Sequence, residues 1–144
     1  KKIREGIDWF NGTIVSNKRW RQGQLTSLIA GIEVLEANDI DGIIVCPVDR
    51  PLISQSLVVD LLQAFWQSGK SIIVPTYNGR RGHPVIFERK WFEELKTAPL
   101  EIGARAVIHA HPEEVCEVPT NEEGVILNID TPDEYEQNIV RAAR

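Results

Sequence analysis

Short apolar runs alternate along this chain with segments whose apolar residues recur at helical spacing, and this alternation most constrains the fold. The runs are bounded by Gly, Pro or polar residues, as buried strands are, and lie at 43–46, 71–75, 85–87, 115–118 and 125–129. The helical segments lie between them at 25–35, 54–69, 91–95 and 103–110. This order predicts βαβ units and a mostly parallel sheet in one α/β domain over residues 1–144.

The two ends of the chain add local signals. Ile3, Ile7 and Phe10 recur at helical spacing, so residues 1–10 predict the end of a helix. Residues 13–16 predict a short strand, and residues 17–24 a polar, basic loop. Near the other end, residues 131–134 read Thr-Pro-Asp-Glu, with Thr at the N-cap, Pro at N1 and Glu at N3 of a last helix.

Composition excludes several classes of protein. Hydrophobic residues make up 42% of the 144 residues and charged residues 26%, which is ordinary for a globular domain and argues against disorder. The apolar runs are too short to span a membrane, and no signal peptide is visible, so we expect a cytoplasmic protein. The net charge of −5 argues against a nucleic-acid binder. The charged side chains are unevenly distributed, however: those of residues 1–22 are mainly basic and those of residues 112–138 are all acidic. This distribution fits either a solvated surface or a basic loop near an anion with acidic groups near a cation.

The chain contains no Met and begins inside an amphipathic pattern. We therefore expect it to be a piece of a longer protein.

The Cys and His residues do not indicate a disulfide framework, a zinc site or a nucleophilic triad. Cys46 and Cys116 each lie in an apolar run and are interpreted as reduced core thiols. On a helix, His109 and His111 would point about 200° apart and could not share one metal ion. No Ser-His-Asp arrangement or nucleophile elbow is present.

Candidate binding groups follow the predicted strands, where ligands bind in open α/β sheets. Asp49 follows the strand at 43–46, between Pro47 and Pro51, which fix the backbone on both sides. Asp130 follows the strand at 125–129. Two carboxylates at one rim can hold Mg²⁺ together with substrate phosphates. The alternative is that Asp49 is a turn residue and Asp130 caps a helix.

Five blocks of the sequence resemble the molybdenum cofactor cytidylyltransferases, a family of Rossmann-like nucleotidyltransferases. The blocks occur in the family's order over residues 13–138, and the loop Gly-Arg-Arg-Gly-His-Pro with the Asp-Thr-Pro end is the most specific part. The matching residues are Gly23 to Leu28 with Gly31, Val45 to Leu52, Pro75 to Val85, Gly103 to Arg105, and Asn128 to Glu134.

The resemblance implies a glycosyltransferase A-like sheet and a Mg²⁺-dependent transfer of a nucleotidyl group from CTP to the phosphate of a pterin cofactor, with release of pyrophosphate. It implies Asp49 as the principal Mg²⁺ ligand and Asp130 as the second. Further roles are implied for Gly23 and Ser27 beside the nucleotide base, and for Arg81, Gly82, His83 and Arg105 toward the acceptor.

The sequence departs from the family pattern in three places. Glu101-Ile102 stands where the family has Gly-Asp, and Arg50 adds a positive charge beside the implied metal. Nothing in the 144 residues matches the family's first strand and its glycine-rich loop, which wraps the triphosphate with backbone N–H groups. We therefore expect the chain alone to be inactive toward NTP. If it folds alone, we expect strand exchange or a homodimer to cover the exposed sheet.

Three functions remain open on the sequence. The first is a nucleotidyltransferase of this type, including versions that use GTP or a sugar or polyol phosphate. The second is a non-catalytic nucleotide- or cofactor-binding module. The third is a structural α/β domain in which every rim residue serves a turn or a cap.

Overall fold

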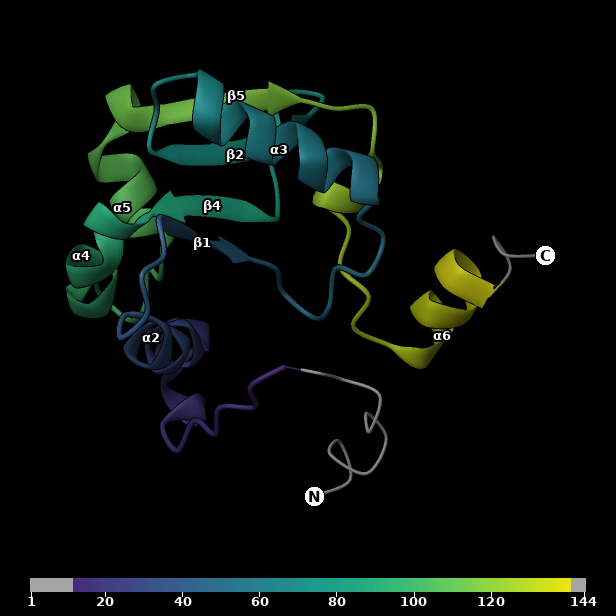
Figure 1. The fold of residues 1–144 in the computed structure, drawn as a ribbon. Coiled ribbons are helices and arrows are strands. Elements are labelled where there is room, and N and C mark those ends of the chain that lie inside the picture. The colour runs from purple at the N-terminus through teal and green to yellow at the C-terminus, as the bar shows by residue number, and fades with distance from the viewer. Residues whose placement is uncertain (1–11, 141–144) are drawn as a thin grey trace.

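The computed structural model describes residues 12–140. They contain five α-helices and five strands, which alternate from α2 to β2 and again from α5 to α6 (Figure 1). The helices are α2 (Gln24–Leu35), α3 (Gln55–Gln67), α4 (Phe92–Thr97), α5 (Arg105–Ala110) and α6 (Pro132–Tyr135). The strands are β1 (Gly42–Val45), β2 (Ile72–Tyr77), β3 (Arg80–Arg81), β4 (Val85–Glu88) and β5 (Val115–Pro119). The helix predicted over residues 1–10 lies outside the described residues.

The strands form one mixed sheet. Strand β1 pairs with β4, and β2 pairs with β4, β3 and β5. Strands β2 and β5 pair in parallel, whereas β4 is antiparallel to both β1 and β2. It follows that β1, β2 and β5 run in one direction and β4 is reversed between them. The predicted α/β fold is confirmed. Three of the five strands share one direction, as a mostly parallel sheet requires, but β4 is reversed between β1 and β2, so that only β2 and β5 pair in parallel.

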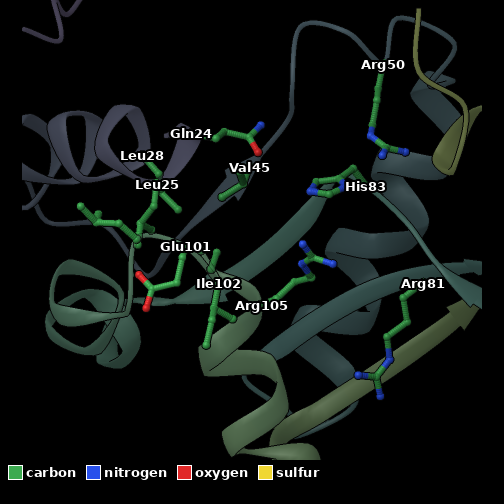
Figure 2. Close-up of a pocket in the computed structure, with 13 residues that line it drawn as sticks. Gln24, Leu25, Leu28, Val45, Arg50, Arg81, His83, Glu101, Ile102 and Arg105 are labelled. Carbon is green, nitrogen blue, oxygen red and sulfur yellow. The ribbon is translucent and has the colours of Figure 1, made fainter. Parts of the chain in front are cut away.

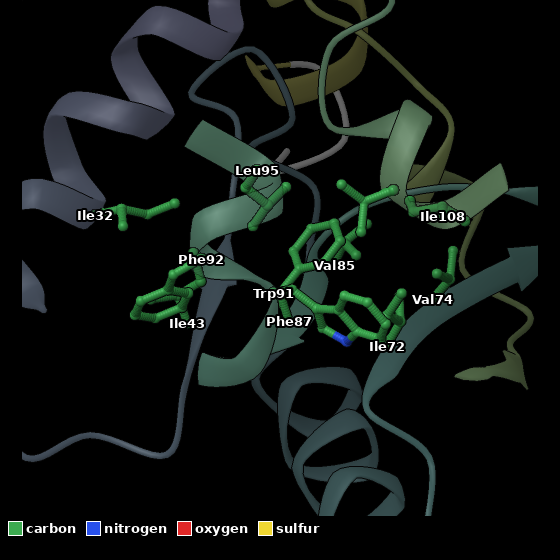
Figure 3. Packing of buried hydrophobic residues seen from close by; sticks show 11 residues of the cluster. Ile32, Ile43, Ile72, Val74, Val85, Phe87, Trp91, Phe92, Leu95 and Ile108 are labelled. Atoms are coloured by element: carbon green, nitrogen blue, oxygen red, sulfur yellow. The ribbon is translucent and has the colours of Figure 1, made fainter. Parts of the chain in front are cut away.

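Helices cover both faces of the sheet (Figure 1). Alternate residues of the strands point to opposite faces, as the two-residue period of a strand requires. Ile72, Val74, Val85 and Phe87 pack with α2, α4 and α5 in one buried cluster, shown in Figure 3. Their neighbours Ile73 and Ile86 pack on the other face with Leu57 and Leu61 of α3 and with Val125. The predicted apolar faces of the helices therefore form a three-layer core.

Local signals fixed the helix ends. Ser54 is the N-cap of α3, and its hydroxyl accepts a hydrogen bond from the N–H of Leu57 at 3.0 Å. Thr131 and Glu134 form a complete capping box at the start of α6. The cap at Thr131 was predicted, because capping depends on residues within one turn of each other.

Two predicted strands are absent from the described residues. Residues 13–16 have no strand assignment and their side chains are exposed. Residues 125–129 contain the end of a short 3₁₀ turn, Glu123–Val125, followed by irregular chain. Val125 is fully buried there, so the apolar run reflects packing against α3 rather than a place in the sheet.

Strand β1 and its cysteine are also more exposed than expected. Among residues 12–140, β1 pairs with β4 only, and Ile44 is 40% exposed instead of fully buried. Cys46 and Cys116 are free thiols as predicted, but Cys46 is exposed and is not a core residue. Within the described part of the chain, no helix has the length and apolarity needed to cross a membrane.

Candidate functional site

Three loops meet beyond the carboxyl ends of β1 and β2. The first runs from Cys46 to the start of α3 and carries Asp49. The second joins β3 to β4 and contains Gly82 and His83, and the third follows the 3₁₀ turn at Glu123–Val125 and carries Asp130. Each loop is joined to a strand or helix that packs in the core. The core therefore fixes the positions of the loop ends.

The backbone carbonyl of Val125 holds the three loops together. It accepts a hydrogen bond from the N–H of His83 at 2.8 Å and another from Nη1 of Arg50 at 2.8 Å. A third bond, from the N–H of Ile129 to the carbonyl of Asp49 at 2.8 Å, runs beside them. The last of these bonds joins the backbones of residues 49 and 129 directly. Asp49 and Asp130 therefore lie on two loop segments that run side by side.

Two glycines permit this crossing. A Cβ at Gly82 would lie within 3.0 Å of the O, C and Cβ atoms of Val125. A Cβ at Gly124 would lie equally close to the O, C and Cβ atoms of Leu52. No side chain fits at either position without moving the backbone, so glycine is required there by close approach.

An open cavity of about 520 Å³ lies beside the crossing, and we call it the outer cavity (Figure 2). The guanidinium groups of Arg50, Arg81 and Arg105 line it, together with His83, and the only acidic lining residue is Glu101. The start of α2 contributes Gln24, Leu25 and Leu28. A surface with three cations and one carboxylate favours an anionic ligand.

The three arginines are not equivalent. Nε of Arg81 forms an ion pair with Glu117 at 2.7 Å, which neutralises much of its charge. Arg50 bonds to a neutral backbone carbonyl and keeps its charge. No carboxylate of residues 12–140 lies within ion-pair distance of Arg50 or Arg105. Arg50 and Arg105 are therefore the groups best able to hold a phosphate.

His83 lies where the acidic and the basic groups meet. Burial lowers the pKa of its imidazole, the Arg50 and Arg105 guanidinium groups lower it further, and the Asp49 carboxylate opposes them. The net effect is a pKa below 6.5, so the imidazole is neutral at pH 7. Its Nδ1 atom is buried and has no hydrogen-bond partner among the described residues.

The two predicted metal ligands, Asp49 and Asp130, lie on loops that are hydrogen-bonded to each other. Asp49 is half-buried and Asp130 exposed. The capping box uses the Glu134 carboxylate, which accepts from the N–H groups of Asp130 and Thr131 at 2.8 and 2.9 Å, so the Asp130 carboxylate is not consumed by the cap. Within residues 12–140, no cluster of three or more His, Cys, Asp or Glu side chains could hold a metal. Two carboxylates suit Mg²⁺, which takes its remaining ligands from water and substrate phosphates.

The predicted nucleotide contacts lie near the outer cavity without lining it. Gly23 is the N-cap residue of α2, directly before Gln24, and has a φ of 111°. The Ser27 hydroxyl accepts a hydrogen bond from the Asn17 side chain at 2.9 Å and is exposed. Three of the four residues predicted to face the acceptor, Arg81, His83 and Arg105, line the outer cavity. The fourth, Gly82, lines a second cavity described below.

A second cavity of about 290 Å³ adjoins the first, and we call it the apolar chamber. The two share Val45, Arg81, His83, Ala104 and Arg105. Core residues of β2, β4 and α5 form the walls of the chamber, and the exposed His109 also lines it. Sequence reasoning gave His109 no role, although its position one helical turn after Arg105 was a usable signal.

Sequence reasoning also missed the chain at Leu100 to Gly103, which lines the outer cavity before α5. Glu101-Ile102 was noted there only as a departure from the family pattern. Arg50 was expected beside the metal site, but its hydrogen bond to Val125, 75 residues away, had no local signal.

A family model described as the MobA-like NTP transferase domain matches residues 2–115. No curated protein sequence matches the chain.

Solved structures share the fold. Rv0371c of Mycobacterium tuberculosis H37Rv is 24% identical, with a TM-score of 0.66, over 79% of this chain and 58% of that one. The same protein in a complex with manganese is 22% identical, with a TM-score of 0.73, over 94% of this chain and 70% of that one. Molybdopterin-guanine dinucleotide biosynthesis protein A from Archaeoglobus fulgidus is 14% identical, with a TM-score of 0.67, over 99% of this chain and 74% of that one. The chain thus spans somewhat more than half the length of Rv0371c in the first of these structures.

Proposed function

The chain belongs to the MobA-like NTP transferase family, and on that premise we propose that it serves the transfer of a nucleotidyl group from CTP to a phosphorylated acceptor of the molybdopterin type. One observation carries the proposal. The guanidinium groups of Arg50 and Arg105 and the imidazole of His83 line one cavity, beside the hydrogen-bonded loops that carry Asp49 and Asp130. Nucleotidyl transfer needs this combination, because a metal ion and fixed cations must act on phosphates at one place.

The chemistry asks for positioning more than for a protein nucleophile. An oxygen of the acceptor phosphate attacks the α-phosphorus of the NTP, the new P–O bond forms, and the bond to pyrophosphate breaks. Arg105 and Arg50 would hold the acceptor phosphate in the outer cavity and offset its charge. The His83 side chain, neutral at pH 7, would orient that phosphate without repelling the cations around it.

Asp49 and Asp130 would hold a divalent cation, Mg²⁺ by our proposal, between the loops. The manganese bound by Rv0371c, which shares this fold, supports a divalent ion at the site. When bound, such an ion neutralises charge on the transferring phosphates. The chain's own contribution is the backbone bond from Ile129 to Asp49, which keeps the two carboxylate-bearing loops in register.

Metal binding provides the first test. We expect Mn²⁺, followed by the EPR signal of the free ion, to bind to the chain, and Asp49→Asn to weaken that binding by at least the roughly tenfold that even outer-shell changes cost. Asp60→Asn, the same chemical change on the exposed face of α3, is the matched control and should leave Mn²⁺ binding unchanged. Equal Mn²⁺ affinity in the wild type, Asp49→Asn and Asp130→Asn would refute the metal assignment and favour the structural reading.

Nucleotide binding provides the second test. A thermal-shift series on the longest form of the protein that the gene encodes, with CTP, GTP and ATP, each with Mn²⁺, should show the largest stabilisation with CTP. Transfer of the labelled α-phosphate to an acceptor, measured on the longest form of the protein that the gene encodes, separates the enzyme from a non-catalytic binding module. Stabilisation by CTP without any transfer would favour the module.

A further inference from the structure

The turn between β2 and β3 has the sequence Asn78-Gly79 and lies on the protein surface. We propose that Asn78 is a site of spontaneous covalent modification, at which the side-chain carboxamide is converted to a carboxylate through a cyclic imide. The reaction takes up water from the solvent and releases ammonia. It places a new negative charge, and in one product an extra main-chain atom, shortly before Arg81 of the outer cavity.

The turn is as short as a hairpin connection can be. Strand β2 ends and β3 begins on either side of it, so Asn78 and Gly79 alone reverse the chain. Both residues have a positive φ, 49° and 73°, as a type I′ hairpin turn requires. Asn and Gly are the residues that adopt this left-handed conformation most readily. The fold therefore selects the same dipeptide that is chemically labile.

The surroundings of the turn leave the reacting groups free. Both residues are exposed, and a Cβ at Gly79 would have no atom within 4 Å, so no neighbouring group blocks the approach of its nitrogen to Asn78 Cγ. Neither the Asn78 carboxamide nor the Gly79 N–H makes a hydrogen bond with residues 12–140. Strand β3 has two residues, both exposed, so little packing opposes the main-chain rotation that the attack needs.

The other described asparagines lack this combination. The carboxamides of Asn17, Asn38 and Asn138 donate hydrogen bonds at 2.8, 3.3 and 2.8 Å. Asn121 and Asn128 are followed by Glu and Ile, whose side chains shield the nitrogen that would attack. The turn asparagine is therefore the described asparagine best placed to react.

The reaction has two balanced steps. The Gly79 nitrogen bonds to Cγ of Asn78, the Cγ–Nδ2 bond breaks, and ammonia leaves with the proton that the Gly79 nitrogen gives up. Water then opens the five-membered imide at one of its two carbonyls. Cleavage at Cγ yields aspartate, whereas cleavage at the main-chain carbonyl yields isoaspartate, whose chain runs through Cβ and Cγ. No oxidant or reductant takes part, and each product carries one more negative charge.

The two products differ in their effect on the hairpin. Aspartate has an ordinary main chain and is accepted in such turns. Isoaspartate lengthens the main chain by one atom and no longer fits the geometry of a two-residue turn. The pairing of β3 with β2 must then shift, and with it Arg81, whose Nε donates to Glu117 at 2.7 Å.

Peptide mapping tests the site. The native 144-residue chain is kept in mildly alkaline buffer and digested with trypsin, and a sample digested at once gives the background. The peptide of residues 71–80 contains Asn78 as its only asparagine. We expect it to gain the mass of the amide-to-acid change and to separate into aspartate and isoaspartate forms, faster than the peptides of residues 22–70 and 106–141. Equal conversion in the three peptides, or conversion at Asn78 in urea but not in the native chain, would overturn the proposal.

Variants separate the ring closure from the exposure of the turn. Asn78→Gln keeps a carboxamide but would have to close a six-membered ring, so conversion in the peptide of residues 71–80 should fall to background. Asn121→Gln is the matched control and should leave conversion at Asn78 unchanged. Conversion in Asn78→Gln at the wild-type rate would refute the imide route.

Limited digestion of the native protein measures the effect on the hairpin. Ion exchange isolates the fraction of the aged sample that carries the added charge and contains isoaspartate. Trypsin should cleave this fraction after Arg80 about threefold to tenfold faster than the unmodified chain, because the loss of cross-strand pairs raises the population of the open hairpin. Asn78→Asp has the same charge on an ordinary main chain and should be cleaved at the unmodified rate. Equal cleavage of the aged fraction and Asn78→Asp would overturn the inferred effect of the longer main chain. Neither assay contains a metal ion or a nucleotide, so the outcome is independent of the proposed function.

Discussion

The close approach of Gly82 to Val125 leads to a quantitative prediction for Gly82→Ala. The new Cβ would lie within 3.0 Å of three Val125 atoms, two of which are backbone atoms that cannot rotate away. The loops must separate, which strains or breaks the hydrogen bond from the His83 N–H to the Val125 carbonyl. Overpacking costs about 1–3 kcal/mol in general, and contact with backbone places this case near 2–3 kcal/mol.

The assay is thermal unfolding of the wild type and the variant, with urea unfolding to confirm the free energy. A chain of this length loses roughly 3–4 °C in Tm for each kcal/mol, so Gly82→Ala should lower Tm by roughly 6–12 °C. The matched control is Gly31→Ala inside α2, where a Cβ has no atom within 4 Å. That change should raise stability by about 0.5–1 kcal/mol, because alanine favours helix more than glycine does.

The two variants therefore make the same chemical change with opposite expected signs. An unchanged or raised Tm for Gly82→Ala would show that the loops do not pack as closely as described. Lowered stability in both variants would point to a general cost of alanine and refute the reasoning from close approach.

Three further predictions concern the scaffold around the site. Ser54→Ala should cost about 1 kcal/mol in urea unfolding, because α3 loses its N-cap, and an unchanged midpoint would contradict the cap. Trp91→Phe should cost about 1–3 kcal/mol, since it leaves the Ser71 hydroxyl without the indole N–H that donates to it at 2.9 Å, and a loss no larger than that of an exposed aromatic would count against the contact. The pKa of Glu114 is held below 4.5, first by the Ser71 hydroxyl and then by Lys90, so its stabilising effect is present at neutral pH and lost as the pH falls below that value. The stability difference between wild type and Glu114→Gln, measured by urea unfolding from pH 7 to 3, should accordingly shrink toward acid pH and should not grow.

Sequence reasoning predicted what depends on neighbouring residues and missed what depends on distant ones. The capping box at Thr131 and the helical face of α3 follow from spacing within a few residues, and both are present. The direction of β4 cannot be predicted from residues 85–87, because an apolar run has the same pattern in a parallel and in an antiparallel strand. Residues 125–129 were predicted as a strand for the same reason, since burial of Val125 produces the same pattern without a sheet partner.

The candidate site divides in the same way. Asp49, His83 and Arg105 were found through motifs, and His83 and Arg105 line the outer cavity. The contact of Arg50 with Val125 and the position of His109 beside the apolar chamber depend on the folded chain. Sequence could name the chemical groups, and only the fold could show which of them share a cavity.

The Val125 carbonyl has a consequence for how such a site can change over time. It is a main-chain atom, so no substitution at position 125 removes the acceptor that orders the loops. The side chains facing the cavities can then be exchanged one at a time while the loops stay in place. Because backbone groups hold the loops, substitutions of the lining side chains can change the ligand while the loop structure stays the same. Acceptor choice should therefore be redesigned at the lining residues and not at the loop crossing.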